Sequence, residues 1–491
     1  MDKLRIAMIT PEVAPLARTG GLGDVLGALP PAIAESGHEV VVFLPRYGSI
    51  STSGIRIAPA GQSPTVNLGG KTTNFTLERL VNEKSKVTTY LIGNRAYFER
   101  TGLFIDPRTG TDYSDNDERF AMFSLAALES LRVMDWVPDV IHLHDWQTAL
   151  VPAFLRTRYV GDRHFARAKT VLTIHNLGYQ GLFPGERFAV LGLPEGYFYP
   201  VTGPVEFFGK VNFLKAGIAQ ANRVTTVSES YAREIQSSNE FGRGLEGVLA
   251  QRGRDLVGIL NGVDYSIWSP ARDQLIPRRY HLRNLSGKRV CRTELVRESG
   301  LPIRDHAPLV GMVTRLTEQK GFDLIAAAVD RLFSRNIQMI ILGAGDQKYH
   351  ELLTEWQKKF PDKLRVFLTF DDALAHRIEA GADVFLMPSH YEPSGLNQMY
   401  SLKYGTVPIV RRTGGLADSV QDFDPVAKTG NGFVFDAYEP KAMLEALDRA
   451  LAVFPKKRVW NQLIKAGMST DFSWAVAAKK YCALYESLAS H

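Results

Sequence analysis

Short apolar runs, each bounded by Gly, Pro or Asp, recur along this chain of 491 residues. Segments with helical periodicity, such as Phe120–Leu131 and Gly321–Phe333, lie between many of them. Strands that alternate with helices imply βαβ units, and such units build parallel sheets. The sequence therefore predicts an α/β fold with these buried strands: Leu4–Thr10, Val40–Leu44, Val140–Leu143, Thr170–Ile174, Arg223–Val227, Leu309–Val313, Met339–Leu342, Leu364–Leu368, Val384–Met387 and Val407–Val410.

A heptapeptide occurs twice, as Arg18-Thr-Gly-Gly-Leu-Gly-Asp24 and as Arg412-Thr-Gly-Gly-Leu-Ala-Asp418. Each copy follows a predicted strand and opens a helical segment, which indicates two similarly wound halves. We expect Rossmann-like, doubly wound domains over residues 1–260 and 265–460, joined by a turn-rich hinge at residues 261–264. Residues 461–491 are expected to form a closing helix that packs back on the first domain.

Composition and charge exclude several classes of protein. No apolar run approaches the ~20 residues that span a bilayer, and the run after the first three residues is too short for a signal peptide, so we expect a cytoplasmic protein without a membrane partner. Cys291 and Cys482 are too few for a disulfide framework and lie outside zinc-binding spacings. The net charge of +6 is mild for a chain of this length, and the sequence contains no block of five or more like charges. No nucleic-acid partner is therefore expected.

Both Gly-rich loops are candidate phosphate-binding sites. Backbone N–H groups at the point where a strand leads into a helix can bind a phosphate without a side-chain base. Tight turns without a ligand are the alternative explanation. The candidate residues are Arg18, Gly20 and Gly21 in the first loop, with Thr413, Gly414 and Gly415 in the second.

Arg315 and Lys320 lie five residues apart where the strand Leu309–Val313 leads into a helix. A planar guanidinium and a compact ammonium can together neutralise a leaving nucleoside diphosphate. The alternative is a solvated helix N-terminus. Because cations are unfavourable at that end of a helix unless an anion is present, the spacing favours a diphosphate clamp.

Glu392 follows the buried strand Val384–Met387, in the segment Glu392-Pro-Ser394-Gly395-Leu396. Ligands of open α/β sheets bind at the carboxyl ends of the strands. A carboxylate there can accept hydrogen bonds from sugar hydroxyls or stabilise a developing oxocarbenium ion. A solvent-facing glutamate is the alternative.

Two strands of the first half end in polar residues, at positions 142–146 and 175–176. Asp145, His175 and Asn176 are suited to hydrogen-bond sugar hydroxyls, with Trp146 as an apolar platform. For His142 the alternative is a satisfied core histidine. A metal site is disfavoured, because the histidines alternate along one strand and no second carboxylate-rich cluster follows.

Residues 112–119 form a polar stretch ahead of a helix, with residue types that cap helix N-termini. Nearby, Tyr97 and Phe98 are expected either to line a sugar groove or to pack in the core.

In their order along the chain, these motifs resemble those of bacterial glycogen synthases and plant starch synthases. The resemblance runs from the first Thr-Gly-Gly-Leu loop through Asp-Asn-x-x-Arg-Phe, His-x-His-Asp-Trp, Asn-Gly-Val-Asp, Arg-Leu-Thr-x-Gln-Lys-Gly and Glu-Pro-x-Gly-Leu to the second Thr-Gly-Gly-Leu loop. It implies the GT-B architecture of two domains facing across a cleft, and a donor held mainly by the C-terminal domain. It also implies retention of anomeric configuration without a catalytic metal.

The resemblance further implies a role for each group of candidate residues. Glu392 is the key active-site carboxylate, Arg315 and Lys320 bind the donor diphosphate, and Phe370 matches a family aromatic near the base. The polar residues that end the two first-half strands contact the glucosyl unit.

The chain departs from the family pattern at three positions. Arg18 stands where the family usually has Lys, which leaves the donor open between ADP-glucose and UDP-glucose. Ser394 stands at a position that is often Cys. Tyr400 occupies the place of a second Glu found in many other retaining GT-B enzymes, which favours the glucan-synthase branch.

We therefore expect a retaining glucosyltransferase that moves glucose from ADP-glucose to the non-reducing 4-hydroxyl of glycogen or another α-1,4-glucan, without a cofactor. A front-face reaction fits the absence of an obvious nucleophile, while a covalent intermediate stays open. The other functions considered are a UDP-glucose-dependent synthase, a sugar-nucleotide epimerase and a non-catalytic glucan-binding protein. An NAD enzyme is disfavoured because neither loop is a Gly-x-Gly-x-x-Gly fingerprint.

Overall fold

The computed structural model describes residues 3–50, 55–82 and 85–490, and the chain divides into two compact units. The first unit extends to Gly262 and resumes at Trp474, and the second comprises Val263–Ser473. The chain thus passes between units at two places, the first of which lies within residues 261–264. In the described part of the chain, no helix is both long and apolar enough to cross a bilayer.

The first unit is built on a nine-stranded sheet whose central strands are parallel. An antiparallel pair, β6 and β3, forms one edge. Ranked by their place in the chain, the parallel strands lie in the order 7-6-5-4-1-2-3, which is a doubly wound arrangement. The full order is β16 (Leu256–Gly258), β15 (Arg223–Thr226), β11 (Lys169–Ile174), β10 (Val140–His144), β1 (Arg5–Ile9), β2 (Glu39–Pro45), β7 (Val87–Gly93), β6 (Thr76–Leu80) and β3 (Ile57–Pro59).

The second unit contains a six-stranded, fully parallel sheet. Ranked along the chain, its strands lie in the Rossmann order 3-2-1-4-5-6. They are β19 (Leu364–Phe367), β18 (Gln338–Leu342), β17 (Leu309–Val313), β20 (Val384–Met387), β21 (Val407–Arg411) and β22 (Phe433–Phe435).

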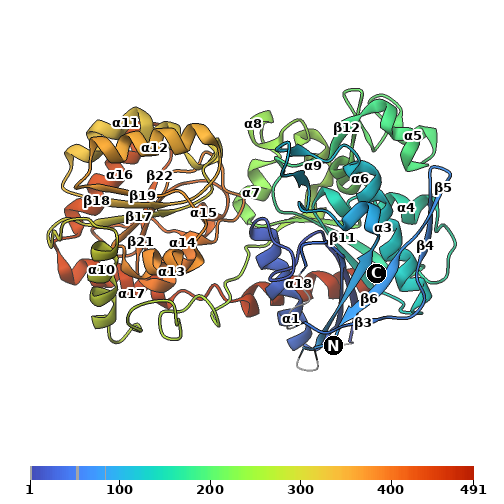
Figure 1. Ribbon diagram of the computed structural model, residues 1–491, viewed down its shortest axis with the longest axis horizontal. Helices are drawn as coiled ribbons and strands as arrows, with labels where there is room; N and C mark the ends of the chain where they lie inside the picture. The colour runs from blue at the N-terminus through green and yellow to red at the C-terminus, as the bar shows by residue number, and fades with distance from the viewer. Residues whose placement is uncertain (1–2, 51–54, 83–84, 491) are drawn as a thin grey trace. The chain divides into compact units, whose positions relative to one another are not determined.

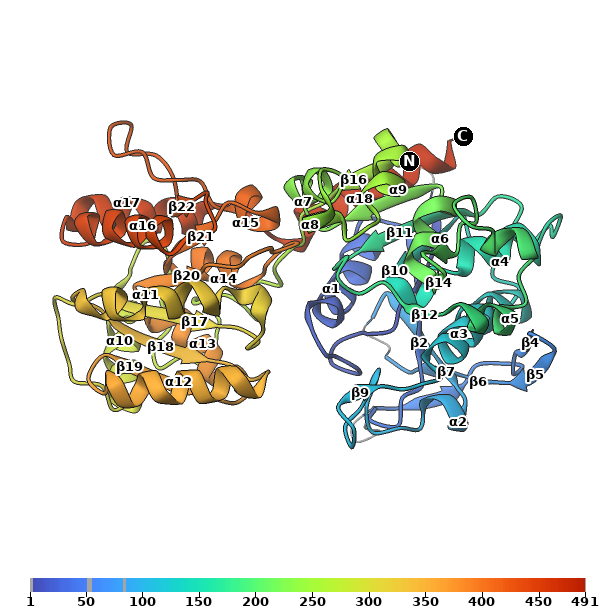
Figure 2. The same ribbon diagram turned by 90° about the horizontal axis from the view of Figure 1, so that it is seen from above.

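Helices cover both faces of this second sheet. Figures 1 and 2 show α11 (Phe322–Ser334) and α12 (Gln347–Lys359) on one face, while α10 (Ser286–Glu298) and α13 (Asp372–Gly381) lie on the other. The strand residues alternate accordingly: Met339 and Ile341 join one core cluster, and Ile340 and Leu342 join the other. This alternation explains why the strands are continuous apolar runs in the sequence.

The α/β class and the two doubly wound domains are confirmed. The ten predicted strands all appear, and no bound differs from the prediction by more than one residue. Among the parallel strands of the two large sheets, the prediction omitted β7, β16 and β22. The last two are three residues long, and β7 contains two threonines that weaken its apolar pattern.

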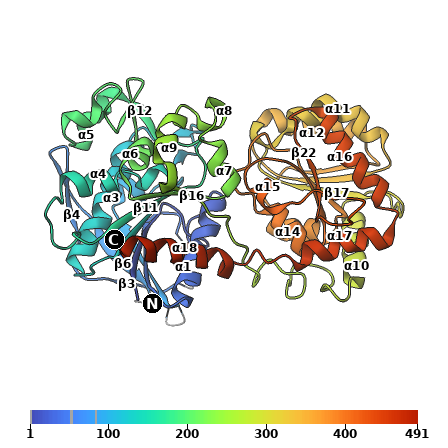
Figure 3. The ribbon, with the colours of Figure 1, turned by 180° about the vertical axis from the view of Figure 1, so that it is seen from behind.

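The end of the chain differs from the predicted boundary at residue 461. Helix α17 (Lys457–Ser469) belongs to the second unit, because Trp460, Leu463 and Ile464 pack in that unit's core. Only α18 (Trp474–Ala489) returns to the first unit, where it lies beside α1 (Gly21–Glu35) (Figures 1 and 3).

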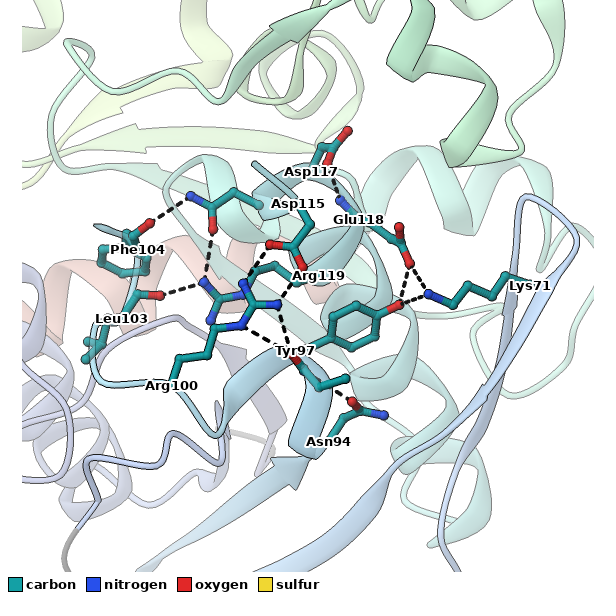
Figure 4. A network of polar contacts seen from close by, with 12 residues as sticks. Lys71, Asn94, Tyr97, Arg100, Leu103, Phe104, Asp115, Asp117, Glu118 and Arg119 are labelled. Carbon is teal, nitrogen blue, oxygen red and sulfur yellow. Dashed lines mark hydrogen bonds and ion pairs between the residues drawn. The ribbon is translucent and has the colours of Figure 1, made fainter. Parts of the chain in front are cut away.

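A polar network surrounds the start of α3 (Asn116–Val133), as Figure 4 shows. Asp115 precedes this helix but makes no capping bond, because its carboxylate accepts hydrogen bonds from Arg100 at 2.6 and 2.7 Å instead. The capping interpretation is therefore wrong for this residue. Tyr97 and Phe98 are buried in the core, and the Tyr97 hydroxyl donates to Glu118 at 2.5 Å.

Candidate active site

The candidate residues of each unit follow the strands at which the strand order reverses. In the second unit this point lies between β17, which leads to Arg315 and Lys320, and β20, which leads to Glu392. In the first unit it lies between β1, which leads to the Gly-rich loop, and β10, which leads to Asp145. Open α/β sheets bind ligands at this point, so each unit places its candidate residues where a ligand is expected.

A pocket of about 150 Å³ in the second unit is lined by the two predicted cations and the predicted carboxylate. Gly395 and Leu396 line it as well. The structure therefore brings together five of the residues that the sequence singled out in this half, although the strands that position them are some 75 residues apart in the chain.

Glu392 is buried and bonded on one side of this pocket. Its Oε2 atom lies 2.6 Å from Nζ of Lys320 and accepts a hydrogen bond from the Ser389 hydroxyl at 2.9 Å. The Arg315 guanidinium, in contrast, makes no hydrogen bond or ion pair with any other described residue. The pocket thus contains one compensated cation and one uncompensated cation, which favours an anionic ligand.

The second Gly-rich loop packs tightly against the chain around Glu392. A Cβ atom added at Gly414 would overlap the Glu392 carbonyl oxygen, and one added at Gly415 would overlap that of Ser394. The Gly415 N–H donates to the Glu392 carbonyl at 3.0 Å. The loop therefore differs from the expected phosphate-binding site, because the Gly415 N–H already donates to a carbonyl of the protein. The close approach of the loop fixes the position of Glu392.

The first Gly-rich loop is held by Glu12, a buried carboxylate that follows β1. Glu12 accepts hydrogen bonds from the Thr19 N–H at 2.6 Å, the Thr19 hydroxyl at 2.7 Å and the Gly20 N–H at 3.4 Å. The Gly20 amide therefore also differs from the expected open phosphate donor. Arg18 forms an ion pair with Asp24 at 2.9 Å on the partly exposed side of the loop.

Asp145 stands at the end of β10 in a strained backbone conformation, with φ of 58°. Non-glycine residues at positive φ are uncommon and cluster at functional sites. The buried carboxylate accepts a hydrogen bond from the His175 N–H at 2.7 Å. Burial raises the pKa of Asp145 to about 7, and the negative charge of Glu12 adds to this effect.

His175 and Asn176 follow β11, next to Asp145. Nε2 of His175 lies 3.1 Å from Nδ1 of His144, and burial lowers the pKa of His175 to about 3. The Asn176 Oδ1 atom accepts a hydrogen bond from the Gly178 N–H at 2.9 Å. The structure thus brings Asp145, His175 and Asn176 together at one edge of the first sheet.

His142 is a core histidine whose ring nitrogens are both hydrogen-bonded, which confirms the alternative given for it in the sequence analysis. It is fully buried, and its two ring nitrogens bond to the hydroxyls of Thr173 at 2.6 Å and Tyr485 at 2.7 Å. Phe370 lies between β19 and α13 and is 78% exposed, so its ring is accessible to a ligand.

Sequence reasoning missed three residues of these clusters. Glu12 holds the first Gly-rich loop, Ser389 bonds to Glu392, and Asn397 lines the second-unit pocket and donates to the Val313 carbonyl at 2.5 Å. Glu12 and Ser389 each follow a predicted strand, so the rule that locates ligands at strand ends could have found them.

Comparison with known proteins identifies the family. Residues 5–251 match the starch synthase catalytic domain, and residues 297–465 match the glycosyl transferases group 1. The chain is 47% identical over 487 residues to a glycogen synthase of Anaeromyxobacter dehalogenans, covering 99% of this chain and 100% of the relative. A glycogen synthase of Koribacter versatilis is 46% identical over 485 residues, with 98% of each chain covered.

Solved structures agree with this result. The catalytic domain of starch synthase IV from Arabidopsis thaliana, bound to ADP and acarbose, matches all of both chains with a TM-score of 0.90 and 33% identity. A sucrose-phosphate synthase from Thermosynechococcus elongatus matches 99% of each chain with a TM-score of 0.60 and 18% identity, which shows a shared fold. The resemblance noted in the motifs is confirmed, and the chain belongs to the glycogen and starch synthase family of glycosyltransferases.

Proposed function

We propose that this enzyme transfers glucose from ADP-glucose to the non-reducing 4-hydroxyl of an α-1,4-glucan such as glycogen, with retention of configuration and release of ADP. The observation that carries the proposal is the second-unit pocket, which is lined by the Lys320–Glu392 ion pair and by Arg315, a cation without an ion-pair partner among the described residues. The similar starch synthase IV structure, with its bound ADP and acarbose, supports the choice of nucleotide and acceptor.

On the donor side, Arg315 and Lys320 hold the diphosphate. The Lys320 ammonium has three N–H donors, so it can keep its bond to Glu392 while it donates to a phosphate oxygen. The exposed ring of Phe370 stacks on the adenine. The remaining donor-side residues are Ser394, Gly395, Leu396, Thr413, Gly414 and Gly415, which shape the segment around Glu392.

On the sugar side, Asp145, His175 and Asn176 bind the hydroxyls of the transferred glucose. With a pKa of about 7, Asp145 exists in both protonation states near neutral pH and can donate or accept a hydrogen bond. Arg18, with Gly20 and Gly21 behind it, supplies a further cation toward the diphosphate.

The reaction follows from these assignments. The bond between the sugar C1 and the diphosphate breaks, and negative charge grows on ADP, where Arg315 and Lys320 stabilise it. The released diphosphate oxygen takes the proton of the acceptor 4-hydroxyl, which forms its bond to C1 on the same face. The Glu392 carboxylate stabilises positive charge on the sugar. Same-face attack retains the configuration.

The test measures initial rates of nucleotide release from ADP-glucose and UDP-glucose, with and without glycogen. We expect ADP release that depends on glycogen. Arg315→Ala and Lys320→Ala should each lower kcat/KM for the donor by roughly 10- to 100-fold with any acceptor, because each removes a charge-assisted hydrogen bond.

The exposed Arg289→Ala on α10 is the control, and it should leave the rates unchanged. Faster release from UDP-glucose would overturn the donor assignment. Isomerised sugar nucleotide without nucleotide release would identify an epimerase instead.

A further inference from the structure

Three histidines of the first unit lie in contact, and only His175 has a part in the proposed transfer. The rings of His142 and His144 have centroids 4.1 Å apart, and those of His144 and His175 have centroids 5.4 Å apart. His142 and His144 are fully buried. The facing nitrogens, Nδ1 of His144 and Nε2 of His175, are 3.1 Å apart, which is hydrogen-bond distance.

Both members of the His144–His175 pair are neutral near pH 7. Burial lowers the pKa of His175 to about 3 and that of His144 well below its usual value, and neighbouring imidazoles add to the effect on His144. A neutral imidazole has one N–H donor and one bare nitrogen that accepts. One of the two facing nitrogens therefore carries the shared proton.

The second ring nitrogen of His144 indicates whether His144 or His175 carries the shared proton. Nε2 of His144 is buried and has no hydrogen-bond partner among the described residues. If His175 donated from its own Nε2, the proton of His144 would have to lie on Nε2 of His144. That atom would then be a buried N–H without an acceptor, and such groups are rare and costly. If His144 donates from Nδ1, its N–H is satisfied and only a bare nitrogen is left over. The second arrangement is favoured.

The surroundings hold His144 in this place. Its backbone N–H donates to the Thr148 hydroxyl at 2.8 Å. Its ring packs on His142, which is fixed in turn by the hydroxyls of Thr173 and, from α18, of Tyr485. The His144 ring therefore cannot turn away without breaking this packing.

His175 is left with a free donor. Its Nε2 accepts from His144, so its own proton lies on Nδ1, which makes no hydrogen bond with any described residue. The His175 backbone N–H is bonded to Asp145, which fixes the main chain at the strand end. His175 is partly exposed at this position.

We propose that His144 is a positioning residue that fixes the tautomer of His175, so that His175 presents an Nδ1–H donor to a hydroxyl oxygen of the donor sugar. The sugar contact rests on the proposed function, while the tautomer does not.

The first test is ¹⁵N NMR of the full-length enzyme with labelled histidine, near neutral pH and without ligands. The His175 signals are assigned from their loss in His175→Gln. We expect protonated Nδ1 and bare Nε2 in His175 of the wild type, and a mixture of both tautomers in His144→Leu. A wild-type His175 protonated on Nε2 would overturn the proposal.

The second test compares the isosteric variants His144→Asn and His144→Leu. The Asn amide nitrogen stands as many bonds from the backbone as Nδ1 of His and keeps the donor, whereas Leu has the same shape without it. We expect His144→Leu to lower kcat/KM for ADP-glucose about tenfold, the value of one hydrogen bond, and His144→Asn to restore most of this loss. Equal activity of the two variants, with equal thermal unfolding, would contradict the proposal.

These tests separate the inference from the function on which it rests. A wild type that does not use ADP-glucose would refute the proposed donor, yet the NMR measurement would still report the tautomer. A wild type that does use it, with Asn and Leu variants that are equally impaired, would refute the role of His144 alone.

Discussion

Glu392 bonds to both Lys320 and Ser389, so its charge and its hydrogen bonds can be tested separately. Glu392→Gln keeps the size of the side chain and an acceptor oxygen for Lys320 but removes the charge that stabilises the sugar. We expect kcat to fall by about 100-fold or more. Ser389→Ala removes one hydrogen bond and should cost about 1 kcal/mol of stability with a much smaller loss of kcat. Turnover near the wild-type rate in Glu392→Gln would remove this carboxylate from the mechanism.

The raised pKa of Asp145 should make the free energy of unfolding depend on pH. The pKa of this carboxyl is raised from its usual 3.8 to about 7 in the folded protein. Between these values the folded state holds a proton that the unfolded state has released, so the free energy of unfolding contributed by Asp145 falls as pH rises, and it levels off above about pH 7.

The Asp145→Asn variant has no carboxyl at this position to titrate, so its free energy of unfolding does not fall in this way as pH rises. Relative to the wild type, the variant should gain stability on the order of 4 kcal/mol between about pH 4 and about pH 8. Thermal unfolding of both proteins at the two pH values measures it. The neighbouring histidines titrate in both proteins, so their contribution largely cancels. A stability difference that does not change with pH would contradict the raised pKa.

At the scale of elements, α18 joins the end of the chain to the strand that leads to Asp145. Tyr485 on this helix is fully buried, and its hydroxyl bonds to His142 on β10. Tyr485→Phe should cost about 1–3 kcal/mol, because it leaves a buried imidazole nitrogen without a partner. Hydrogen exchange of the β10 amides should accelerate, while that of β17 in the second unit should not. Equal exchange in both proteins would show that the bond contributes nothing.

The same elements show what the sequence could predict. The strands β1, β10, β17 and β20 were predictable because each is a buried apolar run with a turn after it, and their carboxyl ends located most of the candidate residues. The contacts of these residues were not predictable. Tyr485 and His142 are 343 positions apart, and nothing local in the sequence of α18 marks the tyrosine as a partner of a histidine.

The Gly-rich loops illustrate the other limit. Their repetition correctly indicated two doubly wound units, because a glycine pair at the end of a strand permits a tight entry into a helix. The sequence could not reveal that the Thr19 and Gly20 amides of the first loop already donate to Glu12, or that the Gly415 amide donates to the Glu392 carbonyl. Both contacts depend on packing between segments that are not neighbours along the chain, and the periodicity of the sequence does not predict such packing.

At the scale of the whole molecule, the proposed transfer uses residues of both units on one donor. Ligand binding should therefore draw the units together, which also excludes water from the reacting sugar. We expect small-angle scattering to give a smaller radius of gyration with ADP and a short α-1,4-glucan than without ligands. Arg18→Ala should reduce this change, because it removes a first-unit cation from the diphosphate. An unchanged radius in wild-type enzyme that is turning over would contradict closure.

Labelling the transferred carbon is the most direct test of glucose transfer from ADP-glucose with retained configuration. The enzyme is given ADP-glucose labelled with ¹³C at C1 of the sugar, together with glycogen, and the label is followed by NMR. We expect the label to move into an α-1,4 linkage of the glucan while an equal amount of ADP appears. Label in a β linkage, in free glucose while glycogen is not extended, or in an isomerised sugar nucleotide would contradict it.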